Sequence, residues 1–95
     1  MGKFKVGDKV RVRRLKDMFC DPDIKVSFYY DKVTEFYDPD DLIFVNEMFP
    51  IAGTVVSVTE DVSGRIMERY RCYCKNDTKW YLSPFFIENE VIESD

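Results

Sequence analysis

The sequence contains no histidine, so it lacks the side chain that most often serves as a general base near neutral pH. Neither a Cys-His nor a Ser-His pair can form. The chain also has no glycine-rich phosphate loop and no G-x-S-x-G motif. Carboxylates are plentiful, but their spacing singles out no catalytic pair. We therefore expect that the protein is not an enzyme.

Long apolar segments and abundant cysteine are missing as well. No apolar run approaches the roughly 18 residues that a membrane helix needs. The basic start, Met1–Lys5, is followed by no apolar stretch of the kind found in secretory signals. Three cysteines are an odd number, which suits a reducing compartment better than a disulfide framework. These features favour a cytoplasmic location without a membrane anchor.

What is present points to a small folded domain. The 95 residues are 45% hydrophobic and 16% aromatic, which is too rich in aromatic side chains for a disordered chain. A chain of this length buries one core with a modest margin. We expect residues 1–95 to form a single domain.

Charge is unevenly distributed along the chain, whose net charge is −4. Residues 1–16 hold seven basic side chains and one acidic one, Asp8, whereas residues 17–61 hold eleven acidic side chains and only two lysines. Either the basic start or the acidic middle could be a contact surface.

Short alternating segments predict a mostly β fold. β-Branched and aromatic residues alternate with polar ones, and turn signals such as Asp38-Pro39-Asp40-Asp41 separate the segments. Single helical turns are expected after Asn46, with Pro50 at its end, and at Ser83–Phe86. We expect strands near residues 8–14, 24–30, 53–60, 66–75 and 79–82, and a short strand with Ile87, Val91 and Ile92 toward the end. The expected core contains Val10, Val12, Val56, Val58, Tyr70, Leu82 and Ile87.

Three segments carry a resemblance to a known family. FKVGDKVRVR, IFVNEMFPIAGTVVSV and KWYLSPFFIE, in this order, resemble a family of short proteins from phages and prophages of Gram-positive bacteria. The resemblance implies a small SH3-like antiparallel β-barrel in the cytoplasm of a bacterial host; most members have no assigned activity. This chain departs from the family outline in its cysteines and in a long acidic insertion at about residues 17–50.

The cysteines allow two interpretations. Cys72 and Cys74 lie one residue apart in an expected strand, so their side chains leave the same face, opposite a face of charged residues. Two buried thiols in a core explain this pattern fully. Alternatively, Cys20 folds back to join Cys72 and Cys74 at a zinc ion, with Asp21 or Asp23 as a fourth ligand. The alternation favours the core interpretation.

The acidic insertion is the candidate contact surface. Large aromatic residues alternate there with carboxylates, and a domain of this size cannot bury every ring. Aromatic anchors beside carboxylates suit a basic protein partner, although a solvated loop would also carry many charges. The predicted partner-binding residues are Tyr29, Tyr30, Tyr37, Asp38, Asp40 and Asp41.

Direct binding to nucleic acid is the alternative. The N-terminal strand carries Lys9, Arg11, Arg13 and Arg14, and small barrels bind nucleic acid through basic, aromatic surfaces. The isoelectric point of about 4.8 means that the chain is negatively charged near neutral pH, whereas a protein that binds phosphates is expected to be positively charged.

These observations lead to a functional hypothesis. We expect a small intracellular protein-binding module of phage or mobile-element type. The resemblance and the acidic insertion together suggest an anti-CRISPR-type inhibitor, because single-chain RNA-guided nucleases carry positively charged channels that an acidic protein could occupy. The alternatives are a nucleic-acid-binding barrel that uses the basic strand, and a structural phage protein.

Overall fold

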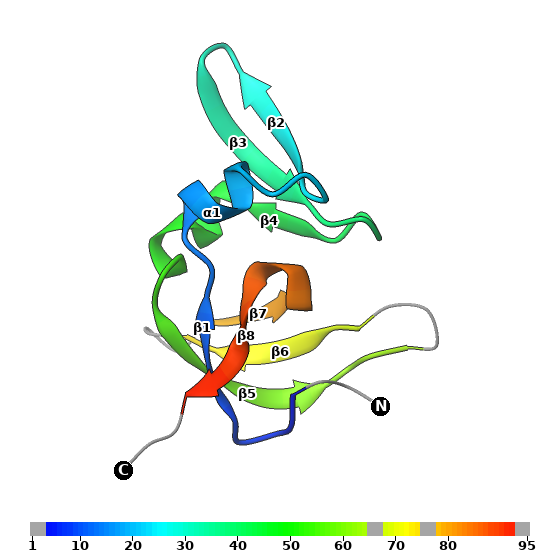
Figure 1. Ribbon diagram of the computed structural model, residues 1–95. Coiled ribbons are helices and arrows are strands. Elements are labelled where there is room, and N and C mark those ends of the chain that lie inside the picture. Colours follow the sequence, from blue (N-terminus) through cyan, green and yellow to red (C-terminus); the bar gives the residue numbers. More distant parts are fainter. Residues whose placement is uncertain (1–3, 65–67, 75–77, 93–95) are drawn as a thin grey trace.

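The computed structural model describes residues 4–64, 68–74 and 78–92, which form two antiparallel sheets (Figure 1). The five-stranded sheet has the order β7-β6-β5-β1-β8, and the three-stranded sheet has the order β2-β3-β4. The five-stranded sheet consists of β1 (Lys9–Val12), β5 (Val55–Asp61), β6 (Tyr70–Tyr73), β7 (Lys79–Leu82) and β8 (Ile87–Ile92). The three-stranded sheet consists of β2 (Lys25–Tyr29), β3 (Lys32–Tyr37) and β4 (Ile43–Val45).

The expected mostly β, antiparallel fold is confirmed, but the sheets do not form a closed barrel. In the five-stranded sheet β5, β6 and β7 follow one another as a meander, and β8 returns to pair with β1. Strands β7 and β8 are the two outer strands of this order. The predicted strand at 66–75 corresponds to β6; residues 66–67 and 75 lie outside the described part of the chain.

The acidic insertion is itself folded. Strands β2 and β3 form a hairpin that projects from the rest of the molecule, and β4 pairs with the other edge of β3 (Figure 1). The sequence predicted β2, but neither β3 nor β4. A register irregularity between Ser27 and Phe28 interrupts the alternation of β3 against β2, and β4 is only three residues long.

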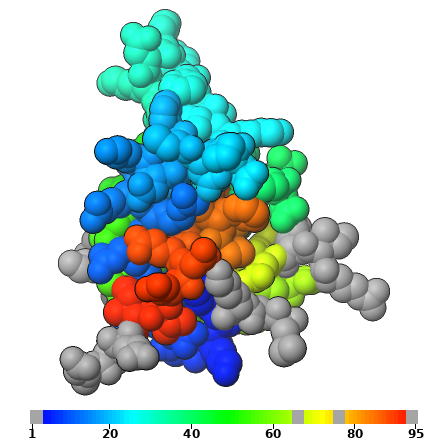
Figure 2. All heavy atoms as spheres, in the orientation of Figure 1, coloured from blue at the N-terminus to red at the C-terminus, as the bar shows by residue number. Residues whose placement is uncertain are grey.

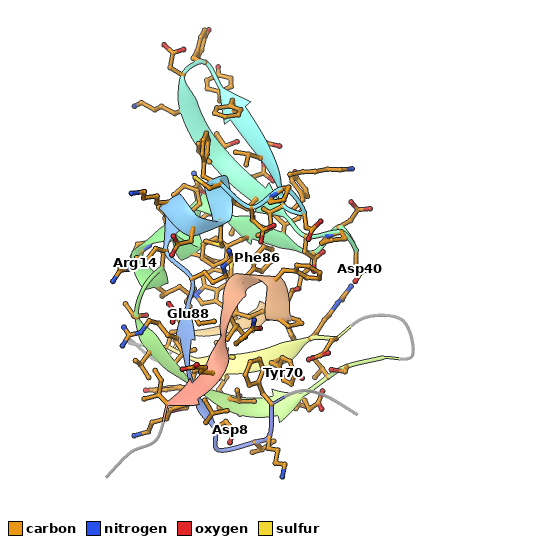
Figure 3. The ribbon with its side chains drawn as sticks, in the orientation of Figure 1. Asp8, Arg14, Asp40, Tyr70, Phe86 and Glu88 are labelled. Atoms are coloured by element: carbon orange, nitrogen blue, oxygen red, sulfur yellow. The ribbon has the colours of Figure 1, made fainter. Side chains whose placement is uncertain are left out.

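The core joins the two sheets. Phe86 lies between them (Figure 3), and its ring centroid is 5.4 Å from that of Phe44 in β4. Phe44 in turn contacts Phe36 of β3 and Phe49. All seven predicted core residues are buried, at 3% exposure or less: Val10, Val12, Val56, Val58, Tyr70, Leu82 and Ile87.

Among the described residues, three short helical segments connect the strands: α1 (Leu15–Phe19), η1 (Asn46–Ile51) and η3 (Pro84–Phe86). The turn predicted at Ser83–Phe86 is confirmed as η3, and the Ser83 hydroxyl caps it by accepting a hydrogen bond from the Phe85 N–H at 3.1 Å. The turn predicted after Asn46 is also present, but the Asn46 side chain does not cap it, and Pro50 lies inside it. Helix α1, which was not predicted, buries Met18. No helix in the described ranges is long and apolar enough to cross a membrane.

Candidate protein-interaction surface

The outer end of the β2–β3 hairpin presents two tyrosines to solvent. Tyr29 pairs with Lys32, so Tyr30 and Asp31 form the two-residue turn. Tyr29 is 67% exposed and Tyr30 86% exposed, and their rings pack edge to face with centroids 4.7 Å apart. The backbone of Tyr30 is left-handed (φ 55°), a conformation that costs a side-chain-bearing residue about 1–2 kcal/mol. Neither ring contributes to the core.

A small apolar pocket lies beside the hairpin. Its volume is about 260 Å³. Phe19, which is 50% exposed, lines the pocket. Its ring meets that of Phe28, 56% exposed, edge to face, with ring centroids 6.1 Å apart. Lys16 contributes the one charged side chain among its lining residues, which are Leu15, Lys16, Phe19, Val33, Phe36 and Phe49. We call this cavity the hairpin pocket; its size and lining suit a single apolar side chain.

The structure separates the predicted partner-binding residues into two groups. Tyr29 and Tyr30 precede β3, whereas Tyr37, Asp38, Asp40 and Asp41 lie at and beyond its other end. Six residues of strand span about 20 Å at 3.4 Å per residue. Asp40 accordingly lies at the base of the projecting hairpin (Figure 3). The aromatic and acidic groups are therefore two separate patches of residues 17–41, a segment that we call the hairpin lobe.

Within the acidic group, the side chains have different roles. Asp38 is 3% exposed, and its carboxylate accepts hydrogen bonds from the N–H groups of Asp40 (2.9 Å) and Leu42 (2.8 Å). It therefore organises the β3–β4 turn, in which Asp41 has a φ of 65°. The Tyr37 hydroxyl donates to Glu35 Oε2 at 2.7 Å, and this hydrogen bond raises the pKa of Tyr37. Of the three predicted aspartates in this group, Asp40 and Asp41 are exposed to solvent and Asp38 is not.

The hairpin lobe is nonetheless acidic as a whole. Residues 17–41 contain eight carboxylates and two lysines, a net charge of −6. Asp21 is neutralised by Arg13, whose Nη1 lies 2.6 Å from Asp21 Oδ2, and this hydrogen bond holds the pKa of Asp21 below its usual value. Among the remaining carboxylates Asp17, Asp23, Asp31, Asp40 and Asp41 are exposed.

The arginines of β1 and its continuation are partly used inside the fold. Arg11 donates to the Gly53 carbonyl at 2.8 Å. Arg13 donates to Asp21 and to the Phe85 carbonyl, at 2.6 and 3.1 Å. Arg13 thus links Asp21 of the insertion to Phe85 in η3, so Arg13 is a structural residue.

A second, larger pocket of about 600 Å³ surrounds this ion pair. Its charged lining includes Arg13 and Asp21, which neutralise one another, together with Glu68 and Glu88. Glu68 accepts a hydrogen bond from the Tyr70 hydroxyl at 2.5 Å. Because much of its polar lining is already engaged, this pocket is a weaker candidate site than the hairpin pocket.

The cysteines divide as the core interpretation expects. Cys72 is 0% and Cys74 2% exposed, so their predicted place in the core is confirmed. Burial raises the pKa of Cys72 to about 12 and also raises the pKa of Cys74, which keeps both thiols neutral near pH 7. Cys20, after α1, is exposed. Within the described residues no three metal-ligating side chains gather in a group that could hold a metal ion; zinc binding remains a prediction.

Sequence reasoning missed Phe19 as a site residue and did not single out Phe28. Phe19 was overlooked because α1 was not predicted, and only α1 brings its ring against β2. No family model, curated protein or solved structure compared with the chain matches it. The geometry of the hairpin lobe therefore carries the functional proposal.

Proposed function

We propose that this protein is a small protein-interaction module that binds its partner through the tip of the β2–β3 hairpin and the adjoining hairpin pocket. The observation that carries the proposal is the exposure of Tyr29 and Tyr30 on a turn that projects from the body of the molecule (Figure 2). Folding gains little from these rings, and the left-handed Tyr30 costs stability. An intermolecular contact would account for both.

The chemistry of the lobe favours a basic partner that offers an apolar side chain. Each large apolar side chain that becomes buried contributes roughly 1.5–3 kcal/mol, and tyrosines are frequent hot spots of interfaces. An apolar anchor of the partner would enter the hairpin pocket between Phe19 and Val33. The exposed carboxylates, Asp40 and Asp41 among them, would steer basic groups toward the lobe.

We also propose that the five-stranded sheet is an open, SH3-like scaffold. Support comes from the order of its elements: β1, the meander β5-β6-β7, the turn η3, and β8 returning to β1. In this proposal the hairpin lobe is an insertion in the first connection of the scaffold. The same element order is consistent with the resemblance to short phage proteins.

The specific role that we propose is inhibition of a single-chain RNA-guided nuclease of a bacterial host. The supporting features are the net charge of −6 in residues 17–41 and the resemblance to phage proteins. Such nucleases bind guide and target in positively charged channels. An acidic lobe with an aromatic tip has the charge and shape to lodge at the entrance of one. Purified protein should then slow target cleavage in a reconstituted reaction.

The binding proposal itself is tested by a comparison of three immobilised proteins in a nuclease-treated bacterial lysate. The wild type and Tyr81→Ala should retain the same partner, and Tyr29→Ala/Tyr30→Ala should lose it. Tyr81 is a matched control because it is an exposed tyrosine (48%) of the other sheet. Equal retention of that partner by all three proteins would show that the hairpin tip is not the contact surface.

A further inference from the structure

The outer face of the five-stranded sheet carries a row of basic and aromatic side chains. Register pairs join Lys9 to Ser57, Ser57 to Tyr73, and Tyr73 to Lys79. Partners in an antiparallel register share a face, so these four side chains line up across β1, β5, β6 and β7. The face opposite holds the buried Val10, Val56 and Cys72.

A second row runs beside the first. Arg71 pairs with Tyr81, and its guanidinium carbon lies 5.5 Å from the centroid of the Tyr81 ring. Arg11 of β1 pairs with Val55 and lies on the same face, but on the other side of the first row from Arg71. Glu60 accompanies these bases, and its Oε2 is 3.7 Å from Arg71 Nη1. Glu90 of β8 is a second exposed acid, two residues before Ile92, the register partner of Lys9. The outer face, defined by Lys9, Arg11, Arg71, Tyr73, Lys79 and Tyr81, therefore has four bases against these two acids.

We propose that this outer face binds a single strand of nucleic acid. Tyr73 and Tyr81 are 41% and 48% exposed, and exposed rings on a sheet are platforms on which unpaired bases stack. Lys9 and Lys79, both exposed, flank Tyr73 in its row and are placed to contact phosphates. A duplex hides the faces of its bases, so the tyrosines select a single strand.

The acidity of the whole chain does not oppose this site. Eight of the carboxylates lie in residues 17–41, which build the other sheet and the segment leading to it (Figure 1). At about 0.1 M salt the Debye length is about 10 Å, so exposed charges on the far side of the molecule are largely screened. The local excess of bases on the outer face then makes the electrostatic potential positive where a single strand of nucleic acid would bind.

This site differs from the hairpin in residues and partner, so each proposal stands without the other. It also differs from the basic N-terminal strand considered from the sequence, because three further strands contribute and Arg13 is excluded by its ion pair with Asp21. Tyr81 and Lys79 lie more than 60 residues from Lys9 in the chain. Only the sheet register brings them together.

The test is fluorescence anisotropy of a labelled oligothymidylate of about twelve nucleotides, titrated with the full chain at about 50 and 200 mM salt. Binding should weaken with salt at a logarithmic slope of about −2, as about three phosphate contacts predict. Lys9→Gln/Lys79→Gln should reduce the slope by about 1.4. Tyr73→Leu/Tyr81→Leu should weaken binding about 30-fold or more at both salt concentrations and leave the slope unchanged.

Two controls make the test decisive. Tyr29→Ala/Tyr30→Ala should bind the oligonucleotide as the wild type does, and a duplex of the same length should compete poorly. Thermal melts of each variant establish that it is folded before its affinity is compared. Absence of wild-type binding at the lower salt, equal competition by duplex, or wild-type affinity in the double tyrosine variant would each overturn the proposal.

Discussion

The hydroxyl oxygen of Tyr70 accepts a hydrogen bond from the backbone N–H of Phe4 at 3.1 Å, across 66 residues of sequence. The two rings also pack edge to face, with centroids 5.3 Å apart. The same hydroxyl donates to Glu68. Tyr70 thereby fastens the segment before β1 to strand β6, in the interior of the five-stranded sheet.

Replacing Tyr70 with phenylalanine should lower the free energy of unfolding by about 1–3 kcal/mol. The ring stays buried, but the buried N–H of Phe4 loses its acceptor and Glu68 loses a donor. Urea denaturation measures the change. Tyr81→Phe is the control, expected within about 0.5 kcal/mol of the wild type because its ring is half exposed. A Tyr70→Phe protein as stable as the wild type would contradict this account.

Stability should fall in alkaline solution, from about pH 9 upward. The pKa of Cys72 is about 12 in the folded protein against 9.0 when exposed, and that of Tyr70 about 12 against 10.0. Between these values the unfolded chain loses protons that the native chain keeps, so the free energy of unfolding decreases as pH rises. For Cys72 alone three pH units correspond to about 4 kcal/mol. Denaturation at pH values from 8 to 11 measures the slope, and Cys72→Ala should make it shallower.

Thiol labelling of the native protein should modify one cysteine and not three. Cys20 is exposed and reacts, whereas Cys72 and Cys74 are buried with raised pKa values and react only after unfolding. The Cys20→Ser variant should show no fast labelling in its native state. Rapid labelling of all three thiols would mean that the β6 cysteines are not held in the core.

Zinc content is the matching measurement for the alternative interpretation. Protein purified without added metal should contain much less than one zinc per chain, and a chelator should leave its melting temperature unchanged. The reason is that Cys72 and Cys74 are buried in the core, whereas Cys20 is exposed, so the three thiols do not share one site among the described residues. A zinc-to-protein ratio near one that is abolished by Cys20→Ser would reverse this conclusion.

The ion pair between Arg13 and Asp21 should make stability sensitive to acid. Its hydrogen bond lowers the pKa of Asp21 below 3.8, so the pair stabilises the fold above that pH and its contribution is lost as pH falls through the lowered value. Asp21→Asn should cost about 1 kcal/mol near pH 7 and less than that near pH 2. The neighbouring Asp23→Asn is the control, since its side chain is exposed. An equal loss at both pH values would exclude an ionic origin.

Binding kinetics should separate the two patches of the hairpin lobe. Asp40→Lys/Asp41→Lys should slow association with a basic partner about tenfold at low salt, because these exposed carboxylates act at long range. Tyr29→Ala/Tyr30→Ala should mainly speed dissociation, by about 30-fold or more. Surface plasmon resonance with the identified partner resolves both rates. Asp38 is unsuitable for charge reversal because its buried carboxylate holds the β3–β4 turn.

Local alternation was enough to predict most of the five-stranded sheet. Successive side chains of a strand leave opposite faces, so the pattern around Val10, Val56 and Cys72 assigned each of them to the core before any partner strand was known. The cap at Ser83 was also predictable, because Ser-Pro before an aromatic pair is a local signal for a helical turn. Predictions of this kind depend on a residue and its near neighbours alone.

The rest depended on contacts between distant parts of the chain. Phe36 and Tyr29 are both aromatic residues of the acidic insertion. Phe36 is 1% exposed because Phe44 and Phe49 cover it. Tyr29 is 67% exposed because it lies at the hairpin tip, where its ring packs against Tyr30, which is itself exposed. The tyrosines before β3, Tyr29 and Tyr30, are separated by the length of that strand from the exposed carboxylates beyond it, Asp40 and Asp41. The sequence by itself determined which side of a strand each residue occupies, since that follows from backbone geometry. Only the tertiary structure decided which sides are covered, because covering a side chain requires a partner that chain order does not specify.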